Sequence, residues 1–103
     1  MSGLDELIHQ PLRLKIMAAL HGEPGGAAID FPRLRRIVEA TDGNLGSHLS
    51  ALEKAGYVAL DKDFVGKKPR TRVSLTGEGR RAFRSHIAYL RDILESAIGS
   101  PKA

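Results

Sequence analysis

Small polar side chains recur at helical spacing in the stretch TDGNLGSHLSALEKAGYV, which runs from Thr41 to Val58. Asn44, Ser47 and Ser50 lie three residues apart, so in a helix they share one face. Amide and hydroxyl groups both donate and accept hydrogen bonds, and an Asn side chain matches the donor–acceptor edge of adenine in the DNA major groove. These residues therefore predict a binding surface at which another molecule comes close to the backbone.

The sequence has no catalytic or metal-binding pattern. Ser47 is next to His48, but adjacent residues of a helix point about 100° apart, which makes the pair a poor nucleophile and base. The chain has no cysteine, and its four histidines, His9, His21, His48 and His86, show no ligand spacing. No Gly-rich phosphate loop or paired-carboxylate motif is found. We expect neither an enzyme nor a bound metal or cofactor.

Three leucines form the opposite face of the same predicted helix. Leu45, Leu49 and Leu52 lie together at about 100° per residue, and we expect them to face the core. The exposed face of the helix then carries short polar side chains and one cation, Lys54, near its C-terminal end.

Several residues of this helix have two interpretations. For His48 a packed, hydrogen-bonded histidine is favoured, and a DNA contact is the alternative. Thr41 or Asp42 can cap the helix, and capping is favoured for Asp42 because phosphate would repel it. Gly43 and Gly46 each disfavour helix by up to about 1 kcal/mol relative to alanine. A close approach by another molecule and close packing on a helix both fit Gly46.

Hydrophobic periodicity and turn residues predict helices around one hairpin. The helix that Asp30 caps is expected to bury Leu34, Ile37 and Val38. The predicted elements are a helix at 4–10, a helix from Pro11 to His21, a very short strand at 27–29, a helix from Asp30 to Ala40, the helix at 42–55, a hairpin at 57–75 and a helix at 76–98.

Basic residues are concentrated in the predicted hairpin and just after it. Between Phe64 and Arg84 the chain has seven basic residues and one acid, Glu78, although the net charge of the whole chain is only +4. The segment from Arg70 to Leu75 alternates as a half-buried strand with a basic outer side does. Because the tip GKKP contains no acid, DNA contact is favoured over a solvated basic face.

The last helix has an apolar stripe that is long for a domain of this size. Its members are spaced alternately by four and three residues: Phe83, Ile87, Leu90, Leu94 and Ala97. A three-helix core would cover only part of this stripe, so we predict that it pairs with a second copy of the chain. The alternative is that the helix folds back onto its own domain.

Length and composition fit this picture. The 103 residues, 42% of them hydrophobic, predict one globular domain with a small core. No apolar run approaches the ~18 residues of a membrane span, and the N-terminus lacks the features of a signal peptide. We expect a cytoplasmic protein without a membrane partner.

Three linked motifs resemble the winged-helix transcription regulators of the MarR/ArsR-like kind, and more closely a small single-domain group among them. The motifs read IHQPLRLKIM, TDGNLGSHLSALEKAGY and KPRTRVSLTGEGRRAF, and they span Ile8 to Phe83. The resemblance implies that residues 42–55 form the recognition helix, that residues 57–75 form the wing and that the terminal helices form a homodimer. Metal-sensing relatives coordinate through cysteines or histidine clusters, which this sequence lacks.

We therefore predict a mainly α (α+β) fold, a winged helix-turn-helix with a C-terminal dimerisation helix. One domain would span residues 1–103, with a short helix at 4–10, the winged-helix core at 11–75 and the dimerisation helix at 76–98. The predicted function is a sequence-specific regulator that binds double-stranded DNA as a homodimer, with the recognition helix in the major groove and the wing on the minor groove or backbone. The alternative is a protein–protein interaction module without direct DNA readout.

The residues expected to contact DNA lie on the recognition helix and the wing, and those expected in the dimer lie at the two ends of the chain. The DNA contacts are Thr41, Gly43, Asn44, Ser47, His48, Ser50, Lys54, Lys67, Lys68, Arg70 and Arg72. The dimer contacts are Leu4, Leu7, Ile8, Phe83, Ile87, Leu90, Leu94 and Ile98. The sequence identifies no pocket for an effector.

Overall fold

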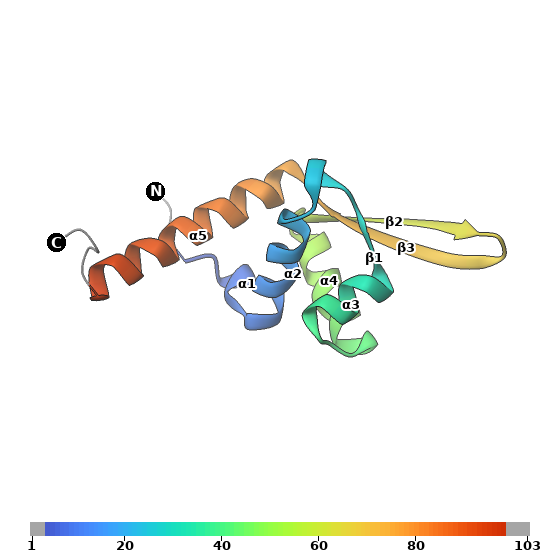
Figure 1. The fold of residues 1–103 in the computed structure, drawn as a ribbon, viewed down its shortest axis with the longest axis horizontal. Helices are drawn as coiled ribbons and strands as arrows, with labels where there is room; N and C mark the ends of the chain where they lie inside the picture. Colours follow the sequence, from blue (N-terminus) through green and yellow to red (C-terminus); the bar gives the residue numbers. More distant parts are fainter. Residues whose placement is uncertain (1–3, 99–103) are drawn as a thin grey trace.

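The chain folds into a group of helices from which a long hairpin extends on one side and a long helix on the other (Figure 1). The computed structural model describes residues 4–98. Its elements are α1 (Glu6–His9), α2 (Pro11–His21), the 3-10 turn η1 (Pro24–Gly26), β1 (Ile29–Asp30), α3 (Phe31–Val38), α4 (Asp42–Lys54), β2 (Val58–Val65), β3 (Lys68–Leu75) and α5 (Gly77–Ile98).

Local sequence signals set the ends of the helices. Gln10 is extended, which separates α1 from α2 just before Pro11, as predicted. The Asp30 carboxylate caps α3 by accepting a hydrogen bond from the Arg33 N–H at 2.9 Å. Each of these two helix starts follows from one residue type. For α2 it is a proline in the first turn, and for α3 it is a short polar side chain just before the first turn.

The sequence offered Thr41 or Asp42 as the cap of α4, and the cap is Thr41, so the prediction that capping is the role of Asp42 was wrong. Thr41 is extended, and its hydroxyl accepts a hydrogen bond from the Asn44 N–H at 3.1 Å. Asp42 is already the first helical residue, where it suits the helix dipole and forms an ion pair with Arg35 of α3 at 3.1 Å.

The sheet has the strand order β1-β3-β2 and is antiparallel throughout. Val58 pairs with Leu75 at the base of the hairpin, and Val65 pairs with Lys68 at its tip. The connecting turn therefore has two residues, Gly66 and Lys67. Gly66 takes the positive φ, 64°, that such a tight turn requires.

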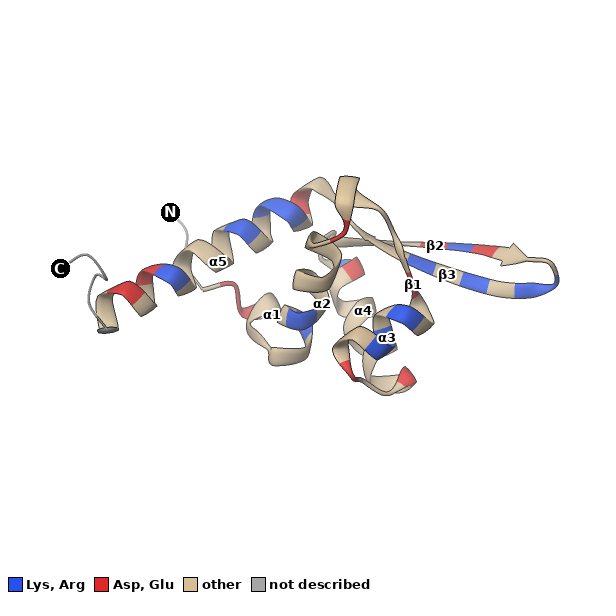
Figure 2. Ribbon diagram, in the orientation of Figure 1, with Lys and Arg blue, Asp and Glu red and all other residues tan. Residues whose placement is uncertain are grey.

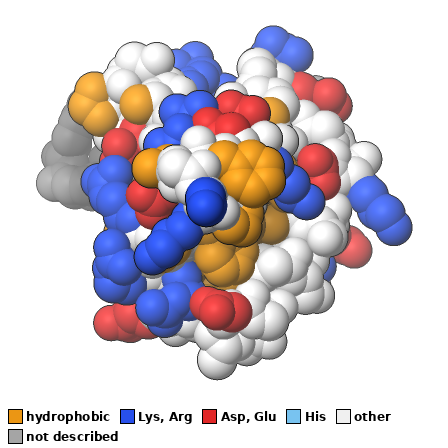
Figure 3. Space-filling view, turned by 90° about the vertical axis from the view of Figure 1, so that its right-hand side faces the viewer, with side chains coloured by type: hydrophobic (Ala, Val, Ile, Leu, Met, Phe, Trp, Pro, Cys, Tyr) orange, Lys and Arg blue, Asp and Glu red, His pale blue; other side chains and the backbone are white. Residues whose placement is uncertain are grey.

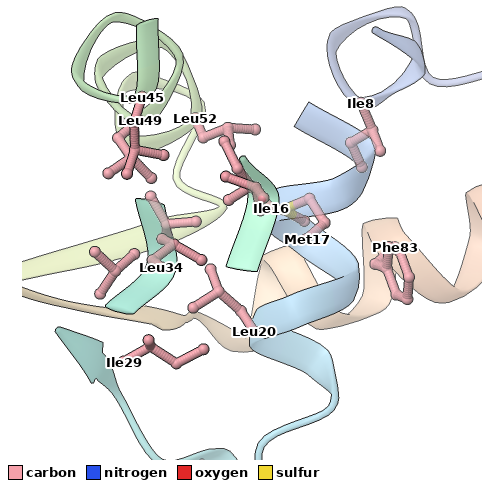
Figure 4. Close-up of a cluster of buried hydrophobic side chains, with 13 residues drawn as sticks. Ile8, Ile16, Met17, Leu20, Ile29, Leu34, Leu45, Leu49, Leu52 and Phe83 are labelled. Atoms are coloured by element: carbon pink, nitrogen blue, oxygen red, sulfur yellow. The ribbon is translucent and has the colours of Figure 1, made fainter. Parts of the chain in front are cut away.

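The core lies where α2, α3, α4 and the base of the sheet meet (Figure 4). Leu45, Leu49 and Leu52 of α4 are at most 1% exposed, as predicted. The prediction for α3 was wrong for Ile37, which is 47% exposed. The core touches this short helix along one line, that of Leu34 and Val38, and Ile37 lies about 100° away from Val38 around the helix axis.

The start of α5 packs very closely on the segment that follows α4. A Cβ added to Gly79 would lie only 2.0 Å from the Tyr57 carbonyl oxygen. The Thr76 hydroxyl caps α5 by accepting from the Gly79 N–H at 2.9 Å, and it also donates to the Gly56 carbonyl. Glycine is required at 79 because no other residue permits this approach of helix and backbone.

A buried polar cluster ties the N-terminal segment to α5. The Asp5 carboxylate accepts from the Tyr57 hydroxyl at 2.8 Å, and the Asp5 N–H donates to Nδ1 of His86 at 3.3 Å. His86 is fully buried, and burial lowers its pKa, so its neutral ring is the hydrogen-bond acceptor. Burial and the Asp5 carboxylate raise the pKa of Tyr57 to about 12.

Among residues 4–98, no helix combines the length and the apolar character needed to cross a membrane.

We expect Gly79→Ala to lower the free energy of unfolding by about 1–3 kcal/mol, the usual cost of overpacking, because its methyl group would collide with Tyr57. Gly46→Ala is the matched control, since a Cβ at this other helical glycine meets nothing within 4 Å. This control should be neutral or stabilising by up to about 1 kcal/mol. Urea unfolding followed by circular dichroism measures both, and equal effects would contradict the close α5–Tyr57 contact.

Candidate nucleic-acid interface

The outer face of α4 is open to solvent. Asn44, Ser47 and Ser50 are all exposed. A Cβ at Gly43 or Gly46 would touch nothing within 4 Å, so these glycines are not explained by packing inside the chain. The backbone of this helix can therefore be approached from outside along its first two turns.

Two sets of contacts hold α4 in place beneath this face. Its three leucines are buried in the core, and His48 is half-buried on its flank. Nδ1 of His48 accepts a hydrogen bond from Arg13 Nε of α2 at 2.9 Å, and the same guanidinium donates to the Leu7 carbonyl at 3.3 Å. This is the packed interpretation of His48. Arg13 was not predicted as part of this site, because within α2 alone it has the character of a surface residue.

The hairpin formed by β2 and β3, here called the wing, has two chemically different faces. Side chains alternate along each strand, and the register places cross-strand partners on the same face. The outer face carries the pairs Ala59–Ser74, Asp61–Arg72, Asp63–Arg70 and Val65–Lys68. The inner face carries the pairs Val58–Leu75, Leu60–Val73, Lys62–Thr71 and Phe64–Pro69.

The two arginines of the outer face are engaged by acids. Arg70 forms a two-pronged ion pair with Asp63 at 2.9 and 2.7 Å, and Arg72 contacts Asp61 at 3.1 Å. The hydrogen bond from Arg70 lowers the pKa of Asp63, which keeps this carboxylate charged. Figure 2 shows the red segments of β2 beside the blue segments of β3.

The expectation of an unmixed basic wing is therefore corrected. Asp61 and Asp63 lie just before the basic stretch that starts at Phe64, on the strand that pairs with it. Within residues 4–98, Lys62, Lys67 and Lys68 form no ion pair, so they are the wing cations that carry uncompensated charge. Lys62 was not among the predicted residues, although its place two residues after the half-buried Leu60 puts it on the inner face.

A groove joins α4 to the inner face of the wing. It has a volume of about 240 Å³ and is lined by Phe31, Gly46, Leu49, Ser50, Leu60, Lys62 and Thr71. None of these residues is acidic. The groove has the Ser50 hydroxyl on its helix side and the hydroxyl of Thr71 and the ammonium group of Lys62 on its strand side, a combination suited to an extended anion such as a phosphate backbone.

The remaining residues predicted for this interface lie on its edges. Thr41 and Lys54, at the two ends of α4, are both exposed, but the Thr41 hydroxyl is already used as the helix cap. Lys67 is in the wing turn and Lys68 begins β3, and both are exposed. The structure thus brings α4 and Lys62 together at one groove, leaves Lys67 at the far tip of the hairpin, and turns Arg70 and Arg72 to the other face of the wing.

The residues predicted for a dimer interface differ in how far they are buried in this chain. Ile8 and Phe83 are 0% and 8% exposed, because they belong to the core of this chain. They have almost no surface to offer to a second copy. Leu4 and Leu94 are exposed, at 41% and 60%. Leu7, Ile87 and Leu90 are half-buried, and the first two of them pack against the core. The side chain of Ile98 lies outside the described residues.

Metal-ligating groups do not cluster in this part of the molecule. Within residues 4–98, no three or more His, Asp or Glu side chains are placed to hold one metal ion. His9 and His86 are neighbours, with ring centroids 6.0 Å apart, but they meet edge to face.

Comparison with known proteins agrees with the fold. Residues 12–94 match a family model described as a winged helix DNA-binding domain. An uncharacterized protein from Methanocaldococcus jannaschii is 33% identical over 82 residues, which cover 80% of this chain and 86% of that protein.

Solved structures of other proteins have the same arrangement of helices and strands. A transcriptional regulator homologue from Pyrococcus horikoshii superposes with a TM-score of 0.81 at 28% identity, covering 91% of this chain and 90% of that one. A MarR-family transcriptional regulator from Silicibacter pomeroyi gives a TM-score of 0.69 at 20% identity, over 94% of this chain and 64% of that one. The predicted mainly helical winged helix-turn-helix is confirmed.

Proposed function

We propose that this chain, which belongs to the winged helix DNA-binding domain family and has the fold of MarR-family transcription regulators, binds specific double-stranded DNA sequences as a homodimer in the cytoplasm. We also keep as a proposal its assignment to the small single-domain group with the TDGNL motif. The observation that carries the function is the acid-free groove, because it joins the open face of α4 to the uncompensated lysine of the inner wing face.

In this proposal α4 lies in the major groove. Asn44 pairs with an adenine edge, while Ser47 and Ser50 bond to bases or phosphates. Gly43 and Gly46 keep side chains out of the way, so that the backbone comes close to the DNA. We leave His48 out of the proposed contacts because its Nδ1 is bonded to Arg13 and the side chain is half-buried.

The wing then follows the DNA backbone toward the neighbouring minor groove. Lys62 lies beside the groove that would hold the phosphates, and Lys67 and Lys68 are at the tip. Arg70 and Arg72 are not proposed as contacts, since Asp61 and Asp63 already neutralise them on the opposite face. This assignment replaces two of the four wing residues with one that the sequence did not suggest.

The second half of α5 supports the homodimer. Every residue from Arg91 to Ala97 is exposed, and the apolar side chains Ile93 and Leu94 are among them, at 45% and 60%. A shallow groove on this half is lined by Tyr89, Asp92, Ile93, Ser96 and Ala97, and a second helix could pack into it. A two-fold dimer would present two copies of α4 to half-sites about one DNA turn apart.

Selection of bound sequences from a pool of random DNA duplexes tests the function. A recovered palindrome with half-sites about 10 base pairs apart, centre to centre, would support a sequence-specific dimer. The alternative, a protein–protein module, predicts no enrichment and no steep loss of affinity with added salt.

Base readout is expected to depend on Asn44. Asn44→Ala should cost about 1–3 kcal/mol at one base pair of each half-site and relax the preference there, because a bidentate contact is lost. Competition binding with single-base variants of the selected duplex measures this. A loss of the same size for every sequence would show that Asn44 does not read a base.

The two faces of the wing should differ in how they respond to salt. Lys62→Ala and Lys67→Ala should each flatten the plot of log affinity against log salt by about 0.9, the value for one lost phosphate contact. Arg70→Ala is the matched control on the same hairpin, and its slope should equal that of the wild type. Fluorescence anisotropy over a salt series measures all three; a flatter slope for Arg70→Ala alone would reverse the assignment of the faces.

Association is expected to depend on the exposed half of α5. Leu94→Glu should produce monomers in sedimentation, because it places a charge in the proposed helix–helix contact without disturbing the core of the chain. Arg81→Glu, at an exposed position in the first half of α5, should remain dimeric. If Leu94→Glu stays dimeric, this half of α5 is not the main interface.

A further inference from the structure

The wing ends in an exposed apolar pair. Phe64 is 69% exposed, and its cross-strand partner Pro69 is exposed as well. Both belong to the inner face, two residues beyond the Lys62–Thr71 pair that borders the groove. Figure 3 looks onto the wing from its tip and shows apolar and basic atoms side by side in the middle of the view.

The charges around this pair indicate what it binds. Lys62 lies on the same face and Lys67 lies in the turn beside the pair, while Lys68 begins β3 on the outer face. None of these three lysines forms an ion pair within residues 4–98. The acids of the wing, Asp61 and Asp63, point to the other face. An apolar group flanked by cations complements an anionic surface with an apolar interior, which is what phosphates around stacked bases provide.

The reach of the wing fits the same partner. Phe64 lies six residues beyond Val58 at the base of the strand, which at 3.3 Å per residue is roughly 20 Å. A minor groove lies about half a helical turn, roughly 17 Å, from the centre of the major groove that α4 would occupy. If α4 lies in the DNA major groove and the wing follows the DNA backbone from there, Phe64 reaches the adjacent minor groove.

We propose that Phe64, backed by Pro69, is a wedge that enters the minor groove beside each half-site and partly unstacks one base step. Apolar side chains that enter the minor groove bend the duplex in this way. Flexible pyrimidine–purine steps cost least to deform, so the wedge would add a sequence preference at positions that α4 does not touch. This inference depends on the proposed DNA-binding function.

The test uses the duplex recovered by selection from the random pool, with 2-aminopurine placed at successive positions flanking the half-site. Wild-type binding should raise the fluorescence of the probe at one flanking step, because unstacking relieves its quenching. Phe64→Ala should abolish that rise and weaken binding about tenfold or more, whereas Phe64→Leu, which keeps an apolar wedge, should retain part of both.

Val65→Ala is the matched control, since Val65 is the neighbouring exposed apolar residue but lies on the outer face. It should behave as the wild type, and because both side chains are exposed the two variants should fold normally by circular dichroism. Tight binding of the duplex without any change in fluorescence, or equal effects of Phe64→Ala and Val65→Ala, would overturn the wedge and leave DNA binding intact. Failure to bind any duplex would instead reject the proposed function.

Discussion

In a two-stranded hairpin, successive side chains point to opposite faces, so its register decides what each face can bind. The two-residue turn at Gly66 and Lys67 fixes that register here. It places both acids of β2 opposite the two arginines of β3 and leaves Lys62 and Phe64 on the other face. A shift by one residue would exchange the two faces. It would put carboxylates beside the α4 groove, where they would repel a phosphate backbone.

The proposed binding surface also requires that the buried side of α4 be fixed to the core while its outer side stays open to solvent. The leucines of α4 pack in the hydrophobic core, and the hydrogen bond between Arg13 and His48 attaches α4 to α2 as well. The residues on the exposed side of α4 have short side chains, and two of them, Gly43 and Gly46, are glycines. Because the free energy of holding the helix comes from its buried side, the outer residues can be chosen for their hydrogen bonds instead of their packing.

The long helix α5 changes its environment along its length. Its first half is part of the monomer, where Gly79 meets Tyr57 and where Phe83 and His86 are buried. Its second half projects away from the core with apolar residues exposed (Figure 1). Exposed apolar side chains on a helix that extends into solvent gain stability only by covering one another, and a second copy of the same helix offers a matching surface. One continuous apolar stripe on α5 can thus pack in the core along its first half and against a second copy of the chain along its second half.

The sequence by itself determined the α-helices and the hairpin, where α2 and α3 begin, and which face of α4 is buried, because these follow from the spacing and type of residues near one another in the chain. It also indicated the polar character of the α4 surface through Asn44, Ser47 and Ser50. It did not predict the 3-10 turn η1, and it placed the short strand at 27–29, whereas β1 is Ile29–Asp30. Only the tertiary structure decided that Asp42 pairs with Arg35 of α3 and that Ile37 stays exposed. The same holds for the burial of Ile8 and Phe83 in the core and for the engagement of Arg70 and Arg72 by acids. Those outcomes depend on groups brought together from separate segments, and no periodicity within one segment carries that information.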